Sequence, residues 1–180
     1  MALDIGAKRL GFAVVSSDSP ESYQVNASGV LGLERGEDEK YQQYRRRLIE
    51  HWVELTPSLL AEYSPDEVVM ETLPAMGSGN FIEAGQSELC KAVGITIIVM
   101  SRLRGYTVRE IAATSWQTKL CGPKPKTKKK RSKVDIRNGV TRVLPDFLEG
   151  RKWLEDVFAD EVDAVGIGLV ALGYGRPKDD

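Results

Sequence analysis

The sequence has 180 residues, of which 42% are apolar and 28% are charged, and its formal net charge at pH 7 is −1. This size suits one domain with a hydrophobic core, which we expect to span residues 1–180. The composition excludes disordered, fibrous and membrane-embedded chains.

Three β-strands are predicted in the first third of the chain. Residues 1–6 form a short apolar run, residues 11–17 form a β-branched run, and residues 22–33 alternate loosely between apolar and polar. Residues 18–21, with the sequence DSPE, have good turn chemistry between the second and third strands. Such short links predict an antiparallel meander.

An amphipathic helix is predicted next, over residues 37–63. Its apolar side chains recur every three or four residues: Tyr41, Tyr44, Leu48, Trp52, Leu55 and Leu59. Pro57 falls inside this helix and should kink or break it. Residues 67–71 then form a compact apolar strand that ends in the carboxylate of Glu71.

A second long helix is predicted over residues 81–104, with Gly105 as its C-cap. It carries one apolar stripe, formed by Ile82, Leu89, Val93, Thr96, Met100 and Leu103. The helix is apolar on more than one side, so it could cover the sheet of its own subunit and also contact a partner.

The last third predicts a strand at 106–111, a helix at 132–144 and a final helix at 160–174, for which Asp160 can serve as N-cap. Hairpins come first and crossovers later, so we expect an α/β fold with a mixed five-stranded sheet. Its first three strands would be antiparallel, and helices would lie on both faces.

A cytoplasmic protein without membrane contact is expected. The longest nearly apolar stretch, residues 92–100, is far shorter than the ~20 residues of a spanning helix. The N-terminus has neither the basic region nor the cleavage site of a secretory signal. The two cysteines, Cys90 and Cys121, form no CxxC pair or Cys/His cluster, so a zinc site lacks ligands and a reducing compartment is indicated.

A basic run occupies residues 124–133. Seven of its ten residues are basic: Lys124, Lys126, Lys128, Lys129, Lys130, Arg131 and Lys133. The acidic residues lie elsewhere, which makes the run a candidate phosphate-binding patch. Taken alone, such a run is more often a solvated loop with no partner.

Four acids stand where the ends of predicted elements could bring them together. Asp4 lies in the first strand and Glu71 ends the fourth, while Asp160 and Asp163 share one face at the start of the final helix. Each has an ordinary explanation when taken alone: an N-cap for Asp160, the helix dipole for Asp163, a turn for Asp4 and a surface position for Glu71. The joint pattern is more specific than any single acid.

Such a cluster needs cations, because carboxylates at close range raise one another's pKa and repel. Oxygen ligands without His or Cys favour Mg²⁺, with Mn²⁺ as a substitute. Two such ions about 3.5–4 Å apart can stabilise the attacking and the leaving oxygen of a phosphodiester hydrolysis. The acids therefore predict a two-ion phosphoryl-transfer site.

Three segments resemble, in the correct order, the signature regions of RuvC-type Holliday-junction resolvases: residues 3–15 (LDIGAKRLGFAVV), 68–94 (VVMETLPAMGSGNFIEAGQSELCKAVG) and 160–175 (DEVDAVGIGLVALGYG). Residues 113–122 (ATSWQTKLCG) and 131–144 (RSKVDIRNGVTRVL) match the intermediate pattern. The resemblance covers nearly the whole chain and implies an RNase H-like fold.

By this resemblance, Asp4, Glu71, Asp160 and Asp163 would be the catalytic metal ligands. The DNA contacts implied by the resemblance and the basic run are Lys119, Lys124, Lys126, Lys128, Lys129, Lys130, Arg131, Lys133, Met76 and Phe81. Pro74 stands where the family has an aromatic side chain at the junction centre, with Met76 and Phe81 nearby, so the residue that wedges into the junction stays open.

The resemblance implies an Mg²⁺-dependent endodeoxyribonuclease that cuts four-way or branched DNA and leaves 5′-phosphate and 3′-hydroxyl ends. It also implies a homodimer formed through the helix at 81–104, because two symmetric strands need two matching sites. A bacterial or phage-infected cell is the expected host compartment, with an organelle as the alternative. The sequence does not identify a branch-migration motor.

Three other classes compete with this interpretation. Another RNase H-like nuclease, such as RNase H, a YqgF-like enzyme or a flap or debranching enzyme, would use the same acids. A non-catalytic DNA-binding module gains nothing from carboxylates that face phosphates. An ATP-binding protein of the actin and sugar-kinase group would need a second phosphate loop and a Gly-rich adenosine site, and we find neither.

Overall fold

The computed structural model describes residues 1–6, 8–19, 22–72, 81–124, 131–149 and 156–175, without the side chains of residues 81–87 and 156–157. Five strands form one sheet: β1 (Ala2–Ile5), β2 (Arg9–Ser19), β3 (Ser22–Gly32), β4 (Glu67–Glu71) and β5 (Thr107–Ile111). The helical elements are α1 (Tyr41–Tyr63), α2 (Phe81–Leu103), α3 (Ala113–Cys121), α4 (Lys133–Val143), the short 3₁₀ helix η1 (Pro145–Leu148) and α5 (Asp156–Ala171).

The sheet has the strand order β3-β2-β1-β4-β5 and is mixed. The hairpin strands β1, β2 and β3 pair antiparallel, whereas β1 with β4 and β4 with β5 pair parallel. The parallel strands follow long helices, since a parallel connection must cross back over the sheet. The predicted mixed five-stranded sheet with an antiparallel first half is confirmed, and β1 is its central strand.

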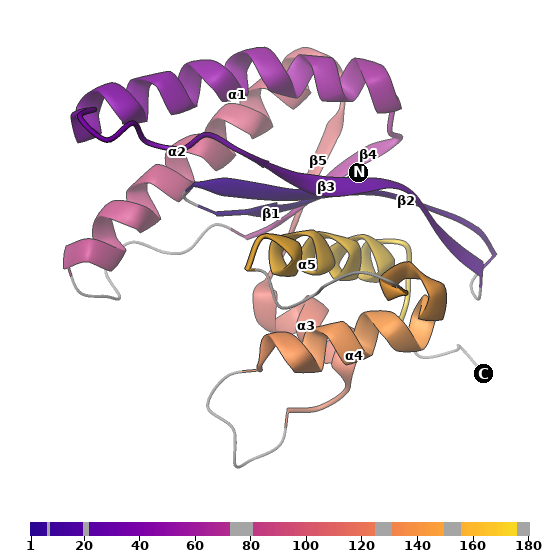
Figure 1. Ribbon diagram of the computed structural model, residues 1–180. Coiled ribbons are helices and arrows are strands. Elements are labelled where there is room, and N and C mark those ends of the chain that lie inside the picture. The colour runs from indigo at the N-terminus through magenta and orange to yellow at the C-terminus, as the bar shows by residue number, and fades with distance from the viewer. Residues whose placement is uncertain (7, 20–21, 73–80, 125–130, 150–155, 176–180) are drawn as a thin grey trace.

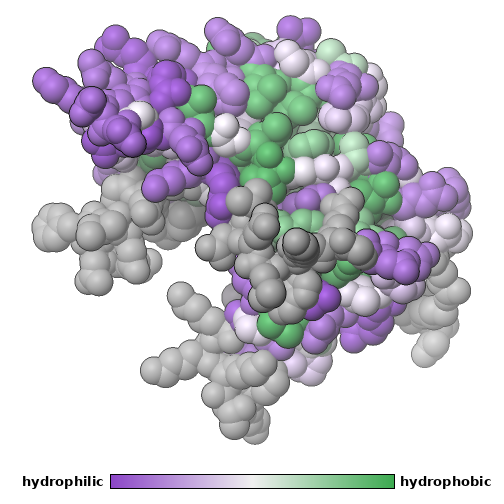
Figure 2. All heavy atoms as spheres, in the orientation of Figure 1, coloured by the Kyte–Doolittle hydropathy of each residue, from purple (hydrophilic) through white to green (hydrophobic). Residues whose placement is uncertain are grey.

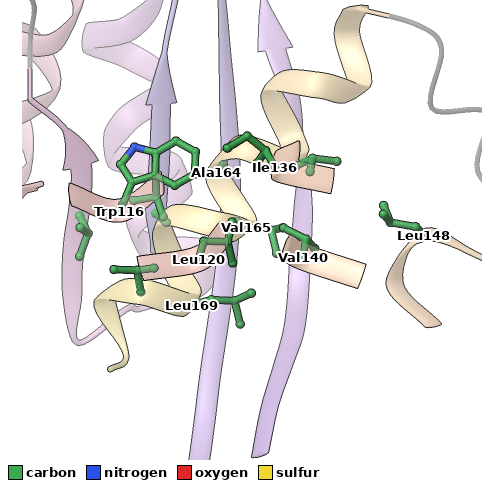
Figure 3. Packing of buried hydrophobic residues seen from close by; sticks show 14 residues of the cluster. Trp116, Leu120, Ile136, Val140, Leu148, Ala164, Val165 and Leu169 are labelled. Carbon is green, nitrogen blue, oxygen red and sulfur yellow. The ribbon is translucent and has the colours of Figure 1, made fainter. Parts of the chain in front are cut away.

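Helices cover both faces of the sheet, as predicted (Figure 1). On one face, α1 and α2 pack over a core that includes Leu48, Trp52 and Val93. On the other face, α3, α4 and α5 enclose a second core around Trp116 and Val165 (Figure 3). Figure 2 shows the hydrophilic outer side of α1 and apolar side chains where α1 meets the sheet.

Two local predictions were wrong, and one helix was missed. The first long helix continues through Pro57 to Tyr63 without a break. Proline has no N–H to donate to the carbonyl of Val53, and Val53 lies on the exposed side of the helix, with 40% of the residue accessible to solvent. The helix α3 was not predicted at all. The final helix begins at Asp156, so Asp160 lies one turn inside α5 and is not its N-cap.

None of the helices in the described part of the chain is long and apolar enough to cross a membrane.

Candidate active site

Two of the four predicted acids lie side by side because of strand register. The parallel strands β1 and β4 pair Leu3 with Met70. The next residues along these strands are Asp4 and Glu71, which therefore reach the same end of the sheet. Side chains at matching positions of paired strands point to the same face, so the two carboxylates share one face.

The other two acids come from α5, which approaches the sheet unusually closely at Gly11. Gly11 pairs with Asp4 across the β1–β2 ladder. A Cβ atom on Gly11 would lie 2.0 Å from the backbone oxygen of Asp160, a distance that no side chain tolerates. The absence of a side chain at Gly11 thus lets α5 carry Asp160 and Asp163 to the strand that holds Asp4.

Three of the acids have a hydrogen-bond donor or cation close to them. The indole Nε1 of Trp116 donates to Glu71 Oε2 at 2.8 Å. The guanidinium of Arg9 contacts Asp160 Oδ2 at 3.1 Å. The ammonium of Lys133 pairs with Asp163 Oδ2. These contacts orient the carboxylates and offset part of their charge.

Asp163 is only partly satisfied by its ion pair. Its side chain is buried, and Oδ1 has no hydrogen-bond partner among the described residues. A buried carboxylate oxygen without a partner is costly, because the oxygen has lost its water and gained nothing in return. In native proteins such an unpaired buried group is explained by a catalytic role or by an ion or water that supplies the missing partner.

Negative charge exceeds positive charge in this cluster. Burial, followed by the charges of Asp163, Glu71 and Asp160, raises the pKa of Asp4 from 3.8 to about 8, against the opposing effect of Lys133. Burial also raises the pKa of Glu71 and of Asp163, and in each case another acid adds to the effect. The four acids therefore act on one another, which makes this a functional-site candidate.

The donor set fits a hard divalent cation in its chemistry and charge. It consists of carboxylate oxygens, it has an orphaned oxygen on Asp163, and it has surplus negative charge. The side chains are not already arranged as ligands: in the described part of the chain, no three His, Cys, Asp or Glu residues form a metal-holding group. Lys133 already pairs with Asp163, one of the candidate ligands, so binding an ion requires the lysine side chain to move.

The predicted DNA-binding residues are only partly described. Lys119 is exposed on α3 and Lys124 is exposed just after it. Arg131 is partly buried and donates to the carbonyl of Gly122. Five predicted positions lie outside the described residues: Lys126, Lys128, Lys129, Lys130 and Met76. The same holds for the side chain of Phe81, the first residue of α2.

Sequence reasoning missed several residues of this site. Trp116 is 1% exposed, and its bond to Glu71 was not foreseen. Arg9 and Gly11 were not singled out. Cys90 is buried and donates its thiol to the carbonyl of Ile5 at 2.9 Å. Burial and then the neighbouring acids Asp4 and Glu71 raise the pKa of this thiol to about 11, so Cys90 stays protonated at the edge of the site.

No known protein-family model matches the sequence, and no curated protein sequence is significantly similar to it. Solved structures do match. Thermus thermophilus RuvC in complex with a Holliday junction substrate has a TM-score of 0.69 at 16% identity, over 97% of this chain and 93% of that one. A second Thermus thermophilus RuvC structure gives 0.65 at 14% identity, over 98% of each chain.

The yeast mitochondrial Holliday junction resolvase also matches, with a TM-score of 0.66 at 13% identity, over 97% of this chain and 77% of that one. At these identities the similarity establishes the fold and not the activity. The strand order, the mixture of parallel and antiparallel pairs and the covering helices agree with these neighbours. The chain has a RuvC-like RNase H fold.

Proposed function

We propose that this protein is a structure-selective endodeoxyribonuclease that resolves four-way or other branched DNA by divalent-cation-dependent hydrolysis. The products would carry 5′-phosphate and 3′-hydroxyl ends. The observation that carries the proposal is the convergence of four mutually interacting carboxylates, from β1, β4 and α5, on a RuvC-like fold. A purely structural role would not assemble four acids with surplus negative charge.

The residues that would hold the ions are Asp4, Glu71, Asp160 and Asp163. When bound, two Mg²⁺ ions supply activation of the attacking water and stabilisation of the departing 3′ oxygen. The protein supplies the orientation of the ligands. Trp116 fixes one oxygen of Glu71 and Arg9 holds Asp160, so both carboxylates are positioned before an ion arrives.

Branched DNA is the substrate class that the comparisons favour. One similar structure is RuvC in complex with a Holliday junction substrate. On this chain, Lys119 and Lys124 are exposed on and just after α3, and α3 also carries the Trp116 that contacts Glu71. Basic side chains near the acids would bind the phosphates of the strand to be cut and would make binding sensitive to salt.

A homodimer is part of this proposal. The helix α2 buries Leu89, Val93 and Ile97 in its own subunit. A second apolar row on the same helix, formed by Ile95, Val99 and Leu103, is 56%, 47% and 74% exposed. An exposed apolar row beside a buried one suits contact with a second copy, which would give two active sites for two symmetric strands.

The test is cleavage of a labelled immobile four-way junction beside matched duplex, flap and RNA–DNA hybrid, in Mg²⁺, Mn²⁺ and EDTA. We expect paired nicks in opposed arms of the junction, none of them in EDTA. The variants Asp4→Asn and Glu71→Gln should lose cleavage and keep junction binding, because they remove ligands and negative charge. Glu110→Gln, which removes an exposed acid from the neighbouring strand β5, is the matched control and should cut normally.

Other outcomes would redirect the proposal. Preference for the flap or the hybrid would keep the metal site and assign a different RNase H-like nuclease. Tight junction binding without cleavage of any substrate would favour a binding module. Full activity of Asp4→Asn would contradict the assignment of the active site itself.

A further inference from the structure

Lys133 reaches into the acid cluster from outside it. It is the first residue of α4, and the start of that helix is fixed by a capping box in which Ser132 and Asp135 bond each other's backbone N–H groups. The side chain of Lys133 is 58% exposed, whereas that of its partner Asp163 is 11% exposed. The ammonium thus approaches a buried carboxylate on a stem that can also extend into solvent.

The ammonium of Lys133 acts on the cluster as a whole. It opposes the rise in pKa of Asp4, Glu71 and Asp163. Burial works to lower the pKa of Lys133 itself, but the charges of Asp163, Asp4 and Asp160 raise it, so the lysine stays protonated. The other cation that contacts a cluster acid, Arg9, pairs with Asp160.

Lys133 and Arg9 together leave the cluster incomplete. Two cations contact four acids, and Oδ1 of Asp163 keeps no hydrogen-bond partner among the described residues while Oδ2 accepts from the ammonium. A divalent ion carries twice the charge of an ammonium and can be coordinated by several oxygens at once. Lysine and metal therefore compete for the same carboxylate, and the ammonium must leave Asp163 Oδ2 before that oxygen can bind an ion.

We propose that Lys133 is a built-in counter-cation that holds the acid cluster together in the metal-free protein and is displaced when divalent cations bind. The inference rests on the proposed metal site and assigns to Lys133 a role separate from phosphate binding. Displacement would let the ammonium extend into solvent, to which the Lys133 side chain is already 58% exposed. Metal loading and the position of this lysine would then be coupled.

The coupling has a signature that ordinary roles of a lysine lack. If Lys133 compensates the acids, its removal destabilises the metal-free protein and strengthens metal binding. If Lys133 only packed against its surroundings, its removal would lower stability by the same amount with and without metal. If it only contacted DNA phosphates, its removal would change neither stability nor metal affinity in the absence of DNA.

The experiment compares wild type with Lys133→Met, which keeps the length of the stem and removes the charge. Mn²⁺ affinity is measured by calorimetry without DNA, and thermal unfolding is recorded in EDTA and in saturating Mn²⁺. We expect a lower Tm than wild type in EDTA, a Kd for Mn²⁺ roughly tenfold or more smaller, and a larger rise in Tm on adding Mn²⁺. Lys133→Arg, which keeps the charge, should restore the Tm in EDTA and bring the Kd back towards wild type.

The matched control is Lys119→Met, which makes the same charge change at an exposed lysine of α3 that pairs with no acid in the described part of the chain. It should leave both readouts near wild type. An unchanged or weaker Mn²⁺ affinity in folded Lys133→Met would overturn the inference while leaving the metal site intact. Failure of wild type to bind Mn²⁺ at all would instead overturn the proposed function.

Discussion

At the scale of single residues, Asp4 bears the largest electrostatic cost of gathering four acids. Its pKa is raised from 3.8 to about 8 by burial and by the neighbouring carboxylates. The folded protein therefore holds this proton more tightly than the unfolded chain does. Without metal, the contribution of Asp4 is least unfavourable below about pH 4, and stability is lost as the pH rises from about 4 to about 8.

Asp4→Asn should therefore stabilise the metal-free protein at pH 8. The expected gain is at least ~1 kcal/mol in the free energy of unfolding, or ~2–4 °C in Tm for a chain of this size. The gain should shrink as the pH falls towards 4 and disappear below it, where the wild-type carboxyl is protonated in both states. Thermal unfolding in EDTA across this pH range measures it, with the exposed Asp66→Asn as control. Equal Tm values at pH 8 would contradict the electrostatic account.

A second prediction at this scale concerns the bond from Trp116 Nε1 to Glu71 Oε2, 2.8 Å long. Trp116→Phe keeps an aromatic ring in the core and removes the donor. We expect the unfolding free energy to fall by about 2 kcal/mol, since a hydrogen bond to a charged group is worth ~1.5–3 kcal/mol. Mn²⁺ affinity should also fall, because Glu71 is no longer oriented.

A double-mutant cycle separates the bond from the packing of the ring. Combining Trp116→Phe with Glu71→Gln should change the unfolding free energy by an amount that differs from the sum of the two single changes, because Glu71→Gln removes the charge that strengthens this same hydrogen bond. Combining Trp116→Phe with the exposed Glu110→Gln should be additive. Additivity in both cycles would show that the indole only fills space.

At the scale of elements, the site depends on how closely α5 crosses the sheet. The Cβ that Gly11→Ala adds would meet the backbone of Asp160 at 2.0 Å, and neither a strand nor a helix backbone can rotate away. We expect α5 to be pushed outwards, at a cost of roughly 3 kcal/mol or more, because overpacking against backbone exceeds the usual 1–3 kcal/mol. Mn²⁺ affinity should fall with stability, since Asp160 and Asp163 move with the helix.

The matched control for this substitution is Gly36→Ala, in the loop before α1. A Cβ at Gly36 would lie 3.5 Å from the side chain of Glu39, which is an ordinary contact. Its chemical denaturation midpoint should stay close to wild type while that of Gly11→Ala drops. A wild-type midpoint and Mn²⁺ affinity for Gly11→Ala would show that α5 does not need this close approach.

Element periodicity explains what the sequence could predict and what it could not. Runs of alternating or three-to-four spacing predicted the five strands and most of the long helices, because each such pattern is local. The helix α3 escaped because its buried side chains, Trp116 and Leu120, are too few to show a period. The start of α5 was misplaced because an acid such as Asp160 is favourable both at an N-cap and inside the first turn of a helix.

The partners of the acids could not be predicted for a different reason. Trp116 contacts Glu71 across 45 positions of sequence, and Lys133 contacts Asp163 across 30. Such pairings depend on which helix face meets which strand, and no local pattern encodes that. The acids themselves could be singled out because the ligands of a hard cation are restricted in residue type, whereas a lysine in a basic run has many uses.

At the scale of the whole molecule, helices on the two faces of the sheet have different surroundings. The face with α3, α4 and α5 carries the acids together with Lys119 and Lys133, and α2 lies over the opposite face (Figure 1). On α2, the apolar row of Ile95, Val99 and Leu103 is exposed. Separate faces for chemistry and for association would let two copies pair without blocking either site. This arrangement makes the proposed dimer testable without disturbing the acids.

The variant Ile95→Lys/Val99→Lys places two charges in the exposed row, where side chains are 56% and 47% exposed. Each subunit should fold with wild-type Mn²⁺ affinity, because the buried row of α2 is untouched. Sedimentation should shift from dimer to monomer, since charges in an apolar interface lose hydration without gaining partners. Junctions should then receive single nicks, as the second site no longer arrives with the first.

Leu172→Lys serves as the control for adding charge to an exposed apolar position, because Leu172 is 42% exposed just after α5, away from α2. It should sediment as wild type and still cut both strands. If wild type sediments as a monomer at the concentrations where it cuts junctions in pairs, the apolar row is not a dimer contact. Paired cutting would then require two separate binding events, and its rate would rise with the square of protein concentration below saturation.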